Sequence, residues 1–92
     1  PGLYAPAHVE GWKRVTGAVH ERGGRVVAQL MHVGRVASRL NKAPGAATVA
    51  PSAIPAAGKM FTDAAGMVPF DAPRALETDE VPAVVAEFGR AA

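Results

Sequence analysis

A single polar side chain interrupts an apolar run and is the first candidate for binding chemistry. Gln29 lies within Val26–Met31, whose other members are all apolar. If this run is a strand, Val27, Gln29 and Met31 share one face, because side chains alternate with a period of two. A buried amide needs partners, since leaving it unsatisfied costs about 1–3 kcal/mol. Two interpretations stay open: Gln29 binds a ligand near the end of a strand, or it bonds to a neighbouring backbone group.

The histidines predict no metal site. His8 and His20 are twelve residues apart, which places them about 120° apart around a helix of ~3.6 residues per turn. His32 belongs to a different element. The chain has no cysteine, which excludes thiolate catalysis and cysteine-ligated zinc. We therefore expect no metal ion and no catalytic residue among these side chains.

Three basic residues and one acidic pair have both a functional and an ordinary explanation. Arg35 and Arg39 follow the apolar run and can meet an anionic group, although loop arginines are more often solvated. Lys59, at the start of a predicted hairpin, has the same two interpretations. Asp79 and Glu80 suit a helix N-terminus, where the helix dipole favours negative charge. A general acid or base is not needed to explain them.

Composition excludes several classes of partner. The 92 residues are 49% hydrophobic and 20% charged, with a net charge of +2, as in a globular chain. There is no basic run, and aromatic residues make up only 5%, which argues against nucleic-acid binding. No apolar stretch approaches the roughly 18–20 residues of a membrane span. We expect a cytoplasmic protein that acts on a small molecule.

Two elements must position these side chains in the first third of the chain. Apolar residues at three- and four-residue steps predict an amphipathic helix over Ala5–Arg22, ended by Gly23 and Gly24. Arg25–Val33 has apolar residues at both odd and even positions, which is typical of a strand buried on both faces in a parallel sheet. Such a strand needs a neighbour on each side, and the sequence contains no second strand of that kind.

The remainder is a decorated loop followed by a helix. Residues 41–73 are rich in Pro, Gly and Ala and show no sustained period. Within them we expect a hairpin with arms Lys59–Thr62 and Met67–Phe70. A second helix is predicted from Thr78, as its N-cap, to the end of the sequence. The order of helix, strand, loop and helix indicates an internal slice of a larger α/β sheet or barrel.

Four stretches in this order resemble the old yellow enzyme family of flavin-dependent ene-reductases. They read VEGWK with HERGG, QLMHVGR, APSAI and PRALETDEVP, and they are found at Val9–Gly24, Gln29–Arg35, Ala50–Ile54 and Pro73–Pro82. The resemblance implies an α/β fold, specifically part of a (β/α)8 TIM barrel. Residues 1–92 then form a fragment of a single FMN-binding domain: its second helix, third strand, capping loop with hairpin, and the start of its third helix.

The resemblance also implies roles for three residues. Gln29 matches the glutamine that binds the pyrimidine edge of FMN. Met31 occupies a position beside the substrate where relatives often have tryptophan. Lys59 lies near a basic residue of the hairpin that closes over substrate or nicotinamide. The family's catalytic His/His or His/Asn pair and its tyrosine are expected after Ala92.

The implied activity is an FMN-dependent NAD(P)H oxidoreductase that reduces activated alkenes such as α,β-unsaturated carbonyls. NAD(P)H reduces the flavin, and hydride then passes to the β-carbon of the alkene. Two alternatives stay open: an iron–sulfur relative of the dienoyl-CoA-reductase type, and an inactive truncated remnant or interaction module. Nucleic acid and membrane are not expected partners, and the oligomeric state is left open.

Overall fold

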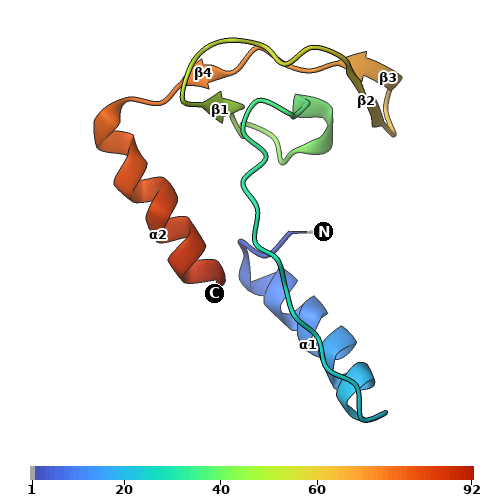
Figure 1. Cartoon of the computed structure of the whole chain (residues 1–92). Helices are drawn as coiled ribbons and strands as arrows, with labels where there is room; N and C mark the ends of the chain where they lie inside the picture. The colour runs from blue at the N-terminus through green and yellow to red at the C-terminus, as the bar shows by residue number, and fades with distance from the viewer. Residues whose placement is uncertain (1) are drawn as a thin grey trace. The chain divides into compact units, whose positions relative to one another are not determined.

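The computed structural model describes residues 2–92, so Pro1, within the predicted domain range, lies outside the described residues. The chain divides into two units, each described here by itself (Figure 1). The first unit holds the residues up to Met31 together with Pro82–Ala92, and the second is His32–Val81. Helices and strands are both present, in keeping with the α/β class. None of the helices in the described part of the chain is long and apolar enough to cross a membrane.

The first helix, α1 (Pro6–His20), confirms the amphipathic helix predicted from the apolar period. Pro6 occupies the first turn, where its missing N–H removes no intrahelical bond. The helix ends at His20, two residues earlier than predicted. Gly23 then adopts a positive φ of 74°, and the Gly24 N–H donates to the Val19 carbonyl at 3.0 Å. This left-handed closure is the role expected of the paired glycines.

The predicted strand Arg25–Val33 is wrong for this chain, since no strand is assigned to it. Val27 is 94% exposed and Val26, on the opposite face of an extended chain, is 37% exposed, so the apolar run is buried on neither face. A strand obtains its hydrogen bonds from neighbouring strands, and none of residues 2–92 provides one for this segment. Residues 25–33 therefore have the composition of a buried strand, but they are not buried in this structure.

The predicted hairpin is confirmed as β2 (Lys59–Thr62) paired antiparallel with β3 (Gly66–Pro69). Gly66 has a φ of 65°, which lets the chain turn after a three-residue loop. The hydroxyl of Thr62, a residue only 1% exposed, donates to the Gly66 carbonyl at 3.1 Å and accepts from the Ala65 N–H at 3.2 Å. The turn is thus closed by local bonds, which explains why local sequence predicts it.

A second pairing inside the predicted loop was missed. Strand β1 (Val49–Ala50) runs parallel to β4 (Arg74–Ala75), preceded in the chain by a short 3-10 helix, η1 (Arg39–Asn41). The N–H of Leu76 donates to the Ala50 carbonyl at 2.9 Å. Ala37 and Ala50, each 3% exposed, form the apolar core of the second unit together with the buried Pro73. Two-residue strands carry no readable period, so the sequence pattern gave no sign of them.

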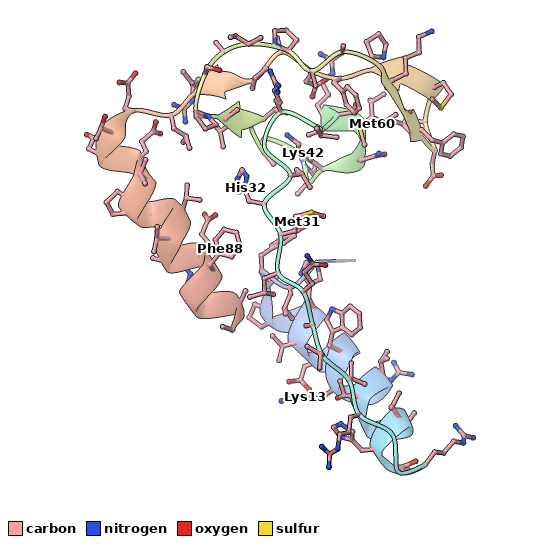
Figure 2. The ribbon with its side chains drawn as sticks, viewed as in Figure 1. Lys13, Met31, His32, Lys42, Met60 and Phe88 are labelled. Carbon is pink, nitrogen blue, oxygen red and sulfur yellow. The ribbon has the colours of Figure 1, made fainter. Side chains whose placement is uncertain are left out.

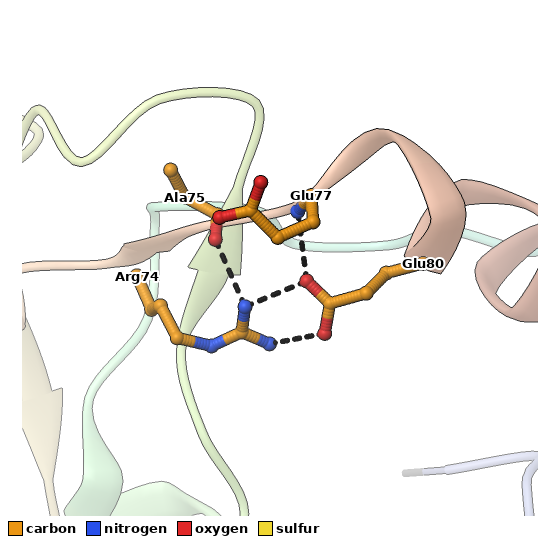
Figure 3. Close-up of polar contacts among 4 residues, drawn as sticks. All are labelled: Arg74, Ala75, Glu77 and Glu80. Atoms are coloured by element: carbon orange, nitrogen blue, oxygen red, sulfur yellow. Dashed lines mark hydrogen bonds and ion pairs between the residues drawn. The ribbon is translucent and has the colours of Figure 1, made fainter.

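The last helix, α2 (Val81–Ala91), follows a 3-10 turn, η2 (Thr78–Glu80). The predicted N-cap, Thr78, is incorrect: Glu77 occupies that position and forms a reciprocal capping box with Glu80. Pro82 lies in the first turn of α2, where it is tolerated, as predicted. Figure 3 shows that Arg74 also reaches Glu80, with Nη1–Oε2 at 2.7 Å and Nη2–Oε1 at 2.8 Å. The side chain of Glu80 therefore stabilises the N-terminus of the helical segment.

The Arg74–Glu80 pair makes this helix start sensitive to acid. The hydrogen bonds from Arg74 and from the Glu77 N–H lower the pKa of Glu80 from 4.5 to about 2. The same pair raises the pKa of Arg74. Because the folded-state pKa of Glu80 is depressed, its stabilisation is complete above pH 4.5 and is lost as the pH falls towards 2.

We predict that Glu80→Gln lowers the melting temperature of the complete protein, by an amount that shrinks as the pH falls from 4.5 towards 2. Thermal melts across this range measure the difference. Glu10→Gln, which removes the exposed Lys13–Glu10 pair, is the matched control with little expected effect. A Glu80→Gln defect that stays constant with pH would contradict the assignment.

We also predict that the 92-residue polypeptide alone unfolds without a cooperative transition or aggregates. Its described core contains few buried apolar side chains, whereas Val27, Met31 and Phe61 remain exposed. Thermal circular dichroism together with size-exclusion chromatography tests this. A sharp two-state melt from a monomer would refute the fragment interpretation.

Candidate functional site

Two of the predicted site residues lie in the first unit. Gln29 is exposed, and none of the side-chain hydrogen bonds among residues 2–92 involves its amide. The alternative in which it bonds to a neighbouring backbone group is therefore not observed in the described chain. Met31, labelled in Figure 2, is 76% exposed. An amide with free donors and a free acceptor is chemically suited to a heterocycle edge that both accepts and donates.

The third predicted residue, Lys59, lies in the second unit, at the first position of β2. It is exposed and faces Pro69 across the hairpin. Phe61, 63% exposed, and its cross-strand partner Met67, 59% exposed, alternate onto the same side. We call Lys59, Phe61, Met67 and Pro69 the open face of the hairpin. This face offers a cation beside apolar surface, which suits a ligand with a planar apolar body and a polar or anionic group.

A polar network at the base of the hairpin was not predicted. The Asp71 carboxylate accepts hydrogen bonds from the Arg39 backbone N–H and, at 3.3 Å, from the Thr48 hydroxyl. The Thr48 hydroxyl in turn accepts from the Lys42 ammonium. Asp71 follows β3 by two residues, so the network holds the chain where it leaves the hairpin. The partners lie 23 and 32 residues away in sequence, and no periodic pattern announces contacts at that separation.

An open cavity of about 420 Å³ lies beside this network. It is lined by Arg39, Ala46, Ala47, Thr48, Asp71 and Ala72. Arg39, one of the two loop arginines considered for an anionic group, borders it, whereas Gln29, Met31 and Lys59 do not. The cavity is therefore lined in part by the residues of the polar network that holds the base of the hairpin. Solvent reaches the Asp71 carboxylate from this side.

The remaining candidates have local structural roles. The imidazole of His32 accepts from the Gly34 N–H at 3.0 Å, within a turn. The Arg35 guanidinium donates to the Ile54 carbonyl at 3.5 Å. His8 meets Tyr4 edge to face, with ring centroids 4.4 Å apart. Glu80 lies at the start of the last helix, as its helix-terminal explanation predicted, and it also pairs with Arg74. Among residues 2–92, no three acidic or histidine side chains gather closely enough to hold a metal ion.

The whole chain matches one protein family. Residues 1–92 fit the model of the NADH:flavin oxidoreductase / NADH oxidase family. Flavin oxidoreductase hxnT of Emericella nidulans is 44% identical over 92 residues, a match covering 99% of this chain and 23% of that protein. 12-Oxophytodienoate reductase 1 of Oryza sativa subsp. japonica is 38% identical over 93 residues, covering 100% of this chain and 23% of that protein. The chain thus spans about a quarter of the length of these relatives.

Solved structures agree with the family match. Morphinone reductase in complex with tetrahydroNAD has a TM-score of 0.84 and 44% identity, over 99% of this chain and 26% of that one. The old yellow enzyme homologue from Zymomonas mobilis has a TM-score of 0.89 and 41% identity, over 100% of this chain and 25% of that one. The chain belongs to the NADH:flavin oxidoreductase / NADH oxidase family, the old yellow enzyme family whose motifs its sequence resembles.

Proposed function

We propose that the chain is part of a single FMN-binding (β/α)8 barrel domain in an NAD(P)H oxidoreductase that reduces activated alkenes. One observation carries the proposal: the family match extends over the entire chain, residues 1–92. Relatives named 12-oxophytodienoate reductase and a neighbour solved with tetrahydroNAD support the alkene substrate and the nicotinamide reductant. In this placement α1 is the second barrel helix, residues 25–33 form the third strand once neighbouring strands are present, and α2 belongs to the third helix.

Gln29 is the residue of this chain that holds FMN. When bound, FMN supplies hydride transfer between the nicotinamide and the alkene. The Gln29 amide donates to a carbonyl and accepts from a ring N–H on the pyrimidine edge of the flavin. Its lack of a partner among residues 2–92 supports this role, because the amide needs no rearrangement of existing bonds to bind. Hydrogen bonds at that edge also tune the electron affinity of the ring.

Met31 and Lys59 are the substrate-binding residues. The Met31 thioether is unbranched and polarisable, so it adapts to substrates of different shapes better than a rigid aromatic ring does. The Lys59 ammonium, on the open face of the hairpin, attracts a carbonyl oxygen or an anionic group of substrate or nucleotide. No residue of this chain matches the family's catalytic His/His or His/Asn pair or its tyrosine, so we assign it no catalytic residue.

The iron–sulfur and remnant alternatives are not favoured by the relatives, which are named flavin oxidoreductase and oxophytodienoate reductase. We place the enzyme in the cytoplasm, acting on a small molecule with no nucleic-acid or membrane partner.

We predict that Gln29→Ala in the complete enzyme weakens FMN binding about tenfold, the loss expected for one or two hydrogen bonds. Gln29→Glu keeps the shape and the acceptor but loses the donor, so its affinity for FMN should also fall. Flavin fluorescence on dilution gives the dissociation constant, and a redox titration gives the potential. An unchanged dissociation constant with unchanged rates in both half-reactions would refute the role.

We predict that Lys59→Met raises the KM for the alkene or for NAD(P)H several-fold, on the order of one lost charged hydrogen bond, and leaves FMN content unchanged. Stopped-flow measurement of flavin reduction and reoxidation shows which ligand is affected. Lys13→Met is the matched control, because it makes the same chemical change at an exposed position of α1. The same KM values in the two variants would contradict a contact between Lys59 and the substrate.

A further inference from the structure

The hairpin has few attachments to the rest of the second unit. Within residues 2–92, the hydrogen bond that joins its strands to another element runs from the Asn41 amide to the Phe61 carbonyl, at 2.9 Å. The bonds made by Thr62 close the turn and remain inside the hairpin. The direction in which the hairpin points must therefore be fixed at its base, where the chain enters and leaves.

Asp71 provides that fixation on the exit side. Its backbone N–H donates to the Ala37 carbonyl at 2.9 Å, while its carboxylate accepts from the Arg39 N–H and the Thr48 hydroxyl. Two of the residues to which Asp71 bonds are buried: Ala37 is 3% exposed and Thr48 is 9% exposed. Asp71, two residues beyond β3, is thus bonded to a buried part of the unit. Asn41, from the same segment, ties the first arm.

Lys59 lies on the first arm, and it forms a cross-strand pair with Pro69, two residues before Asp71. A hairpin is stiff across its paired strands, so a tilt at Pro69 moves Lys59 with it. We infer that Asp71 is a positioning residue, which through the base of the hairpin sets where Lys59 meets the substrate. This inference rests on the proposed contact of Lys59. Asp71 itself touches neither substrate nor flavin.

The test uses the complete FMN-loaded enzyme. Asp71→Ala removes the acceptor, whereas Asp71→Asn keeps a carbonyl oxygen able to accept both bonds. Arg39→Ala is the matched control, since it removes a side chain of the same cavity but retains the N–H that Asp71 accepts. Asn41→Ala loosens the other arm and serves as an independent variant if Asp71→Ala does not fold.

We expect Asp71→Ala to raise the same KM that Lys59→Met raises, several-fold and by no more than Lys59→Met does, with unchanged FMN content, and to speed hydrogen exchange of the amides in residues 59–69. Asn41→Ala should shift both readouts in the same direction. Asp71→Asn should restore both readouts, and Arg39→Ala should match the wild type. A double mutant with Lys59→Met should be no worse than Lys59→Met alone, because Asp71 acts through Lys59.

Two results overturn the inference: wild-type exchange and KM in Asp71→Ala, or a double mutant whose defects simply multiply. Each leaves the defect of Lys59→Met intact, so the proposed substrate contact survives. Failure of the proposed function has a different signature, a wild-type KM in the Lys59→Met enzyme, and the inference then falls with it.

Discussion

The arrangement of the second unit depends on the hydrogen bonds that the Asp71 carboxylate accepts. It accepts from the Arg39 N–H and the Thr48 hydroxyl, and thereby joins the 3-10 segment, the approach to β1 and the exit from the hairpin. Hydrogen bonds to a charged acceptor are stronger than neutral ones. In a unit whose buried apolar residues are two alanines and a proline, such bonds replace the packing that larger side chains provide in other proteins. The parallel pairing of β1 with β4 follows directly after this junction.

Local structure was predictable from the sequence, and non-local structure was not. Val9, Trp12 and Val15 sit at helical spacing, and α1 forms where they predict it. The hairpin is likewise closed by contacts between residues four or fewer apart, such as Thr62 with Gly66. The Asp71 network and the β1–β4 pair join residues more than twenty positions apart, and nothing in a local pattern encodes which distant partner a polar side chain will meet.

The predicted strand Arg25–Val33 does not form, and the reason again lies in missing non-local partners. Arg25–Val33 has the composition of a strand buried on both faces, yet strand formation is a property of pairs and not of one segment. Without neighbours the segment keeps Val27 at 94% exposure. The same absence leaves Gln29 without a partner. Composition alone therefore did not predict the local geometry of this segment, and the role of Gln29 stays a prediction.

The candidate site residues fall into two units, and this division has a mechanistic consequence. Gln29 belongs to the first unit, whereas Lys59 and its support through Asp71 belong to the second. The bonds that orient Lys59 all lie within the second unit. A change there leaves the bonding capacity of the Gln29 amide untouched. The proposed contacts of Gln29 with the flavin and of Lys59 with the substrate thus depend on separate sets of bonds.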